Sequence, residues 1–139
     1  MTLAGAYRSA TPLGKIKFMT KKEIAIDFLK LVSSGKVREA YEKYVHKDFF
    51  HHNAYYKGDR ESLLQAMEEK AEQFPNKTYV ILRALEDDDL VSIHAKVTGI
   101  FDADLAVIHI FRFEGDQMIE EWDAAQEETN DSPNQNGIF

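Results

Sequence analysis

Hydrophobic residues near the start of the chain recur at helical spacing. Thr20 and Glu23 form a capping box, in which each side chain satisfies a free backbone N–H of the first turn, so a helix is predicted to begin there. Apolar residues follow at intervals of three and four, which places them on one helix face. Gly35 is predicted to end this helix, because glycine adopts the left-handed conformation of a helix C-terminus at little cost.

Two more helices are predicted before the pattern changes. A second apolar stripe runs over Val37–Val45, and a third helix is predicted between Asp59, which can cap it, and Pro75, which stops it. The stretch Phe49–Tyr56 between them is rich in aromatic residues and is predicted to be extended.

From Thr78 onward the pattern is that of strands rich in β-branched and aromatic residues. Four strands are predicted, at Thr78–Glu86, Leu90–Thr98, Leu105–Phe113 and Gln117–Ala124. Their short connections favour antiparallel neighbours, so they are expected to form a meander. We therefore predict an α+β domain with three N-terminal helices packed on a curved antiparallel sheet, which forms a cone with an internal pocket.

Composition and charge exclude several classes of protein. With 44% hydrophobic residues in 139, the chain can bury a core, and no apolar run approaches the ~20 residues of a membrane span. A net charge of −7 argues against nucleic acid as a partner. The chain has no cysteine, which excludes disulfides and thiolate chemistry and favours a cytoplasmic location.

The two ends of the chain show no regular pattern. Residues 1–18 have neither a helical nor a strand period, and we expect a poorly ordered or arm-like extension that can be deleted without loss of folding. Residues 19–128 are expected to form the cone domain. Residues 129–139 contain Asn, Pro and Gly without a period and are expected to be a loose tail.

Three segments in order resemble one family. They are Phe49–Asn53 (Phe-Phe-His-His-Asn), Asp89–His94, and Arg112–Asp123, which ends in Ile-Glu-Glu-Trp-Asp. Together they resemble the SnoaL-like branch of the nuclear transport factor 2-like superfamily, over about residues 20–128. The resemblance implies a cofactor-free cavity fold. In that family some members close polyketide rings by aldol condensation, and others are isomerases, dehydratases or binding proteins.

The sequence departs from the family pattern at three positions. Ala54 stands where the family usually has Pro, Glu121 where it has His, and His109 where it has Asp. A carboxylate and an imidazole are thus exchanged between two neighbouring strands. The family's catalytic assignments therefore cannot be transferred without examining this site.

Alternation along the strands supplies the candidate site. His109 and Phe111 share the apolar face of their strand, and Glu121 shares a face with Asp123, although the pattern does not say whether that face lines the pocket. His52, Asn53 and Asp123 match motif positions of the family. We expect these residues to line one cavity, with Asp123 or His109 as the base, His52 and Asn53 stabilising an oxygen, and Phe111 and Trp122 nearby.

The sequence alone does not decide on which face of the sheet His94 lies. Its motif match favours the pocket, whereas its neighbours Ser92 and Lys96 favour the outer face. A metal site built from His52, His94 or His109 with Asp123 has no support in local spacing, so neither a metal nor a cofactor is expected.

Two functions from different classes remain. One is a cyclase, lyase or isomerase that acts by general acid–base catalysis on a small, largely apolar carbonyl compound. The other is a non-catalytic domain that binds a hydrophobic molecule in the same cone. In either case the apolar face that carries Ile108, Ile110 and Arg112 predicts a homodimer formed through the sheet.

Overall fold

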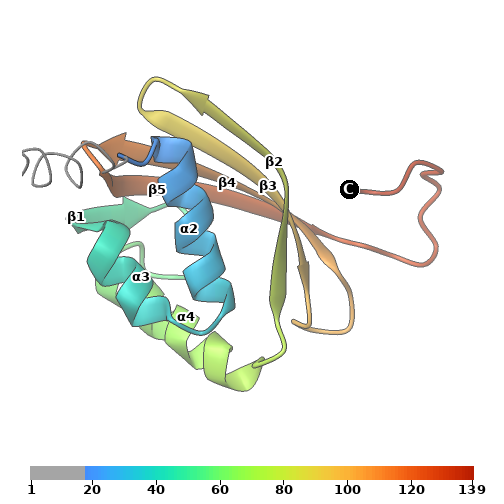
Figure 1. Cartoon of the computed structure of the whole chain (residues 1–139). Coiled ribbons are helices and arrows are strands. Elements are labelled where there is room, and N and C mark those ends of the chain that lie inside the picture. The colour runs from blue at the N-terminus through green and yellow to red at the C-terminus, as the bar shows by residue number, and fades with distance from the viewer. Residues whose placement is uncertain (1–17) are drawn as a thin grey trace, which may run out of the picture.

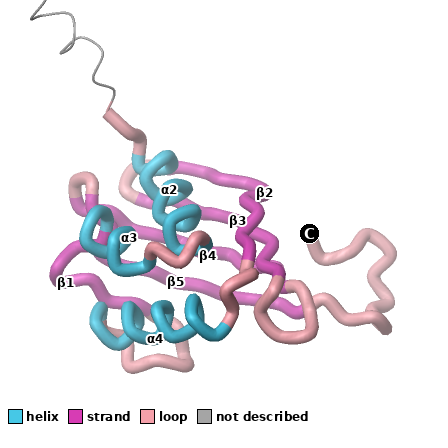
Figure 2. The backbone as a smooth tube through the Cα atoms, turned by 60° about the horizontal axis from the view of Figure 1, so that its bottom comes forward, coloured by secondary structure: helices cyan, strands magenta, loops and turns pink. Residues whose placement is uncertain are grey.

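Three helices cover one face of a five-stranded sheet in the computed structural model, which describes residues 18–139 (Figures 1 and 2). The helices are α2 (Lys21–Ser33), α3 (Val37–Tyr44) and α4 (Arg60–Gln73). The strands are β1 (Val45–His51), β2 (Thr78–Asp87), β3 (Leu90–Thr98), β4 (Leu105–Glu114) and β5 (Gln117–Glu127). The predicted α+β class is confirmed.

The helices begin and end where local chemistry places them. The Thr20 hydroxyl accepts a hydrogen bond from the Glu23 N–H at 3.1 Å, and the Asp59 carboxylate accepts one from the Ser62 N–H at 3.0 Å. Gly35, just beyond α2, has a φ of +84°. The predicted caps and the glycine stop are therefore confirmed.

The sheet is mixed rather than wholly antiparallel, with the strand order β1-β5-β4-β3-β2. Strands β2 to β5 form the predicted antiparallel meander, but β1 pairs with β5 in parallel. The chain between them contains α4 and three strands, so no short turn forces this pair to be antiparallel. The extended segment also lies earlier than predicted, and it ends at His51 rather than at Tyr56.

A β-bulge determines which side chains of β5 face the helices. The β4–β5 register shifts between Arg112 and Phe113, which pair with Glu120 and Met118. Met118 and Glu121 are therefore both buried on the inner face, although they are three residues apart. Beyond the bulge normal alternation returns, and the inner face of β5 includes Asp123 as well.

The core lies between this inner face and the helices. Phe28 of α2 packs against Tyr41 of α3 and Phe111 of β4, with ring centroids 5.7 and 5.9 Å apart. Alternate residues of β3 are fully buried on the same face, and they include Val91 and Ile93. The sheet is not closed, so β1 and β2 are its two edge strands.

Of the two terminal segments, the structure describes the C-terminal one. The predicted extension over residues 1–18 lies outside the described residues, except for its last residue, Phe18. Beyond β5, residues 128–139 form turns without a helix or strand, and the Phe139 ring lies 4.4 Å from the Lys96 ammonium. No helix among residues 18–139 is long and apolar enough to cross a membrane.

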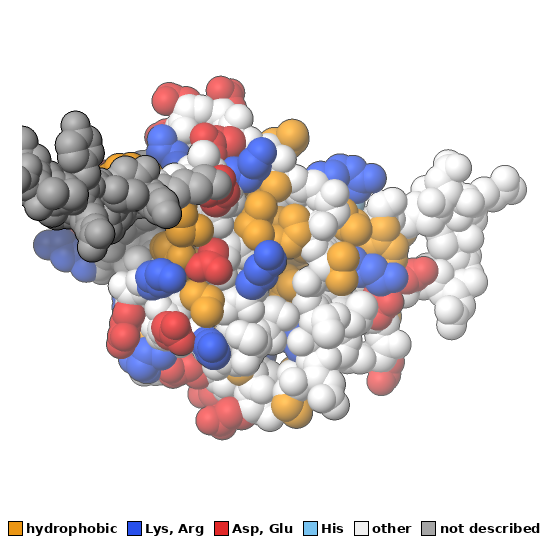
Figure 3. Space-filling view, viewed as in Figure 1, with side chains coloured by type: hydrophobic (Ala, Val, Ile, Leu, Met, Phe, Trp, Pro, Cys, Tyr) orange, Lys and Arg blue, Asp and Glu red, His pale blue; other side chains and the backbone are white. Residues whose placement is uncertain are grey.

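The surface over the helices carries charges of both signs. On the face drawn in Figure 3, acidic and basic side chains are interspersed with small apolar patches. The net charge of −7 is therefore not gathered into one acidic field on this side.

Candidate functional site

A cavity of about 140 Å³ lies between the helices and the inner face of the sheet. Most of its lining is aliphatic or aromatic and comes from α2, α4, β4 and β5. The polar side chains of the candidate site that line it are Asn53, His109, Glu121 and Asp123. The face of β5 that carries Glu121 and Asp123 thus lines the cavity. Alternation in the sequence did not decide this.

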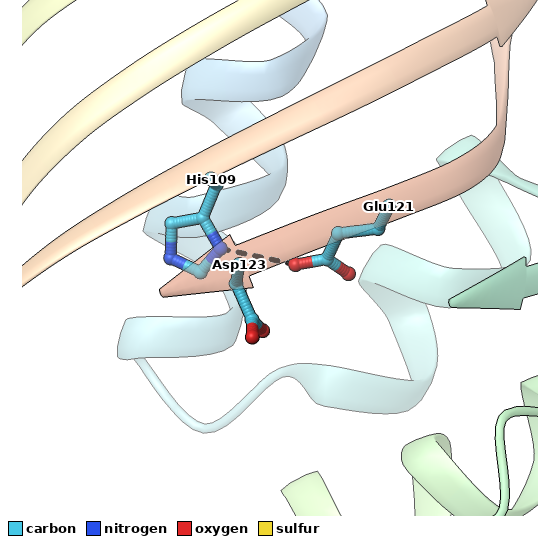
Figure 4. Close-up of side chains that lie close together, drawn as sticks. All are labelled: His109, Glu121 and Asp123. Carbon is cyan, nitrogen blue, oxygen red and sulfur yellow. Dashed lines mark hydrogen bonds and ion pairs between the residues drawn. The ribbon is translucent and has the colours of Figure 1, made fainter. Parts of the chain in front are cut away.

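His109 and Glu121 form a buried pair in this cavity. The His109 Nδ1 and Glu121 Oε1 atoms are 3.0 Å apart, and the two residues are only 8% and 7% exposed. They sit diagonally on neighbouring strands, and Figure 4 shows the imidazole of β4 reaching toward the carboxylate of β5. When Glu121 is ionised and His109 is neutral, the carboxylate can only accept, so Nδ1–H is the donor and Nε2 carries the free lone pair.

The other ring nitrogen has no protein partner. His109 Nε2 is buried and makes no hydrogen bond within residues 18–139. An unpaired buried ring nitrogen is costly, so this atom is a candidate contact for a bound molecule.

Asp123 completes the polar cluster from the position directly opposite His109 on β5. The Asn53 side-chain amide donates to both carboxylate oxygens, at 3.0 and 3.3 Å, and thereby fixes the orientation of Asp123. One ring nitrogen of His109 and one carboxylate oxygen from each of Glu121 and Asp123 lie within 4.8 Å of one another. A single reacting group could therefore contact all three side chains.

Two of the three tyrosines that line the cavity, Tyr41 and Tyr79, bring neutral hydroxyl donors to it. Burial, followed by the charges of Glu121 and Asp123, raises the pKa of Tyr79 to about 12. Burial and the charge of Glu121 also raise the pKa of Tyr41 well above its usual value. Both phenols therefore keep their protons at neutral pH and can donate to an oxyanion.

The raised Tyr79 pKa predicts a loss of stability in alkali. A group whose pKa is higher in the folded state stabilises the fold below its unfolded pKa of 10.0, and this contribution is lost as the pH rises to about 12. Tyr79→Phe should therefore lose less stability than the unaltered protein over this range. Urea unfolding at both ends of the range measures it, and an equal loss in both proteins would contradict the assignment.

The comparisons with known proteins support the architecture. No family model matches the sequence, and no curated protein matches it. Among solved structures, an NTF2-like protein of unknown function from Cytophaga hutchinsonii matches with a TM-score of 0.67 at 13% identity, over 79% of this chain and 93% of that one. The chain has the nuclear transport factor 2-like (NTF2-like) fold.

Two further structures with this fold are candidate polyketide cyclases. One is IdmH from Streptomyces antibioticus, with a TM-score of 0.66 and 15% identity over 78% of this chain and 93% of that one. The other is from Bacillus cereus, with a TM-score of 0.65 and 24% identity over 78% of this chain and 79% of that one. The resemblance inferred from the sequence is confirmed at the level of the fold.

Within this NTF2-like fold, His52 and Trp122 lie outside the cavity. Because His51 pairs with Glu121, His51 is the buried residue and His52 points to the outer face. There its ring stacks on Trp122 at 5.0 Å and its Nε2 lies 2.7 Å from the Glu120 carboxylate. The expectation that His52 stabilises an oxygen in the cavity is therefore not met by its position.

His94 also lies on the outer face, where its Nδ1 is 2.8 Å from the Arg83 guanidinium. The metal set of His52, His94 or His109 with Asp123 cannot assemble, because only His109 and Asp123 are on the inner face. Phe111 is inside but supports rather than lines the cavity. It is 1% exposed and stacks on the His109 ring at 5.6 Å.

The sequence interpretation did not assign several residues of the cavity wall to the site, among them Tyr41, Lys77 and Tyr79. Tyr41 belongs to the apolar stripe of its predicted helix, and its inward position on that stripe could have identified it as a wall residue. Tyr79 lies two residues before Ile81 on the inward face of β2, and this alternation could have identified it as well. Lys77 precedes a strand and follows a helix, so no periodic pattern covers it.

Proposed function

We propose that the cavity binds a small, largely apolar carbonyl compound and transfers a proton at the carbon next to the carbonyl, without a cofactor. The observation that carries this proposal is the buried His109–Glu121 pair, 3.0 Å apart in the wall of the cavity. Glu121 holds the imidazole in one tautomer, with the Nε2 lone pair available as a base.

The site supplies both the base and the hydrogen-bond donors that the proposed step needs. His109 Nε2 removes the proton, the C–H electrons form the enolate double bond, and the carbonyl electrons move to the oxygen. The imidazolium is stabilised by Glu121, and the oxyanion by the hydroxyl of Tyr79 or Tyr41. The Asp123 carboxylate is a second base in the cavity, and it can accept a proton from the substrate and return it to another atom.

Three outcomes are open to such an enolate. Return of the proton to another carbon is isomerisation, expulsion of a group from the neighbouring carbon is elimination, and attack on a second carbonyl closes a ring. Two structures with this fold are candidate polyketide cyclases, which supports the third outcome for those proteins. For this chain the shared chemistry is proton transfer next to a carbonyl.

The size of the cavity limits the substrate. At about 140 Å³ it is close to the engineered 150 Å³ cavity that binds benzene. A single ring or a short chain of similar size therefore fits.

Hydrogen–deuterium exchange tests the proposed function. Cyclopentanone, a small ketone of suitable size, is incubated with the protein in D₂O, and loss of its α-proton signal is followed by NMR, with and without a chelator. We expect exchange faster than in buffer and insensitive to the chelator. Binding without any accelerated exchange would favour the non-catalytic binding domain, and loss of exchange on chelation would indicate a bound metal.

We also propose that two copies associate through the outer face of the sheet. The exposed apolar residues of this face include Val80, Leu85, Leu90, Ile108 and Ile110. Their register puts them on one side of the sheet, away from the helices. A second copy would remove this surface from water, and the same face would serve in both copies.

Placing a charge on that face should separate the dimer. Ile110→Glu is expected to weaken self-association roughly 100-fold, because each copy would bury an unpaired carboxylate. Analytical ultracentrifugation at micromolar concentration measures the change. Tyr55→Glu is the matched control, since Tyr55 is 90% exposed on a loop outside the sheet. An unaltered protein that sediments only as a monomer would refute the proposed dimer.

A further inference from the structure

A buried lysine lines the same cavity without a charged partner. Lys77 is only 5% exposed, and within residues 18–139 its ammonium makes no hydrogen bond or ion pair. Its Nζ lies 5.7 Å from the centroid of the Tyr79 ring. An ammonium held in a mostly apolar cavity without an opposite charge is unfavourable, so its placement calls for a ligand or a cost in stability.

The position of Lys77 is fixed by its backbone. Its N–H donates to the Phe74 carbonyl at 3.2 Å, just after α4. Gly99 approaches the same loop so closely that a Cβ there would lie 2.8 Å from the Asn76 oxygen and 3.1 Å from the Lys77 Cα. Gly99 also has a φ of +78°, so a glycine is required for this contact.

No carboxylate of the described residues forms an ion pair with this lysine. Glu121 is hydrogen-bonded to His109, and Asp123 to Asn53. Burial and then the charge of Lys70 lower the pKa of Lys77, and Lys70 also lines the cavity. Lys77 at one end and the His109–Glu121 pair at the other give the cavity a polarity along its length.

The register of the sheet separates these two ends. Lys77 directly precedes β2, whose first residue pairs with Thr98 at the end of β3. His109 lies four residues into β4, past the turn that follows β3. Tyr79 bridges the interval, because its ring is 6.4 Å from the His109 ring and 5.7 Å from the Lys77 ammonium.

We propose that the ligand is a small oxo acid, whose carboxylate binds Lys77 while its carbonyl and adjacent C–H face His109. The proposal rests on the proposed function for the role of His109, but the carboxylate site itself does not require any reaction. Lys70, which also lines the cavity, adds positive charge and favours an anion further. The ligand is thus narrowed from a neutral carbonyl compound to one that carries a negative charge.

A pair of unreactive probes tests the carboxylate site directly. Butyrate and butyramide have the same number of heavy atoms as benzene but differ in charge, and their binding is measured by ligand-observed NMR. We expect the unaltered protein to bind butyrate at least tenfold more tightly. Lys77→Met should abolish this preference, Lys77→Arg should retain part of it, and the exposed-lysine control Lys57→Met should leave it unchanged.

Folding and chemistry are followed separately. Lys77→Met should melt at or above the temperature of the unaltered protein, because it removes an unpaired buried charge. Equal binding of butyrate and butyramide by the unaltered protein overturns the proposal without any variant, and so does a preference that survives in Lys77→Met. Exchange of neutral cyclopentanone reports only on the proposed function, so the two ideas can fail independently.

Discussion

Replacing Glu121 with Gln is expected to slow α-proton exchange by roughly two to four powers of ten, the usual contribution of a general base. Gln has nearly the same shape, but its amide can donate to Nδ1 of His109. That hydrogen bond favours the tautomer with the proton on Nε2, which cannot act as a base. The defect should therefore appear in the rate of exchange with the fold preserved, as judged by circular dichroism and melting temperature.

The neighbouring residue provides a matched control. Glu120 faces the opposite side of β5, where it bonds to His52 and Arg112 at 2.7 and 2.8 Å. Glu120→Gln makes the same chemical change one residue away, and it should leave exchange within a few-fold of the unaltered rate. If both variants lost activity equally, the loss would come from general destabilisation and the assignment of His109 as the base would be wrong.

Replacing Phe111 with Ala is expected to cost about 3–5 kcal/mol of unfolding free energy, the usual range for a buried aromatic residue. Phe111 packs edge-on against Phe28 and lies flat against the His109 ring. Its removal leaves a void that the surrounding strands and helices can only partly fill. Equilibrium unfolding in urea measures the loss.

Tyr55→Ala is the control for this void, since Tyr55 is also aromatic but is 90% exposed on a loop outside the sheet. Its cost should stay below roughly 0.5 kcal/mol, because the ring packs against little of the protein. A comparable loss in both variants would mean that the loss does not come from the core position of Phe111. That outcome would contradict the present description of Phe111 as the core support of His109.

Most of the architecture was predictable because it follows from local interactions. The helix caps at Thr20 and Asp59 involve groups three residues apart, and the stop at Gly35 reflects the backbone preference of one residue. The antiparallel meander followed from the short connections between strands. These features depend on neighbours in the sequence, so the sequence is sufficient to indicate them.

The candidate site was only partly predictable, and the partial success has a clear cause. Alternation correctly grouped His109 with Phe111 and Glu121 with Asp123, because strand geometry assigns faces with a period of two. It did not say which face the helices would cover. The sequence also shows that His109 and Glu121 depart from the family pattern, with imidazole and carboxylate exchanged between two strands. In the fold these two side chains contact each other.

Two features depended on contacts between distant segments. The placement of β1 beside β5 makes His51 the inner residue and sends His52 to the outer face, a one-residue difference that no local motif resolves. Lys77 lies in a loop without periodicity, and its entry into the cavity depends on the close approach of Gly99. The sequence by itself thus determined the elements, their order and the alternation of their side chains. Only the tertiary structure decided which face lines the cavity, because that choice is made by packing between residues far apart in the chain.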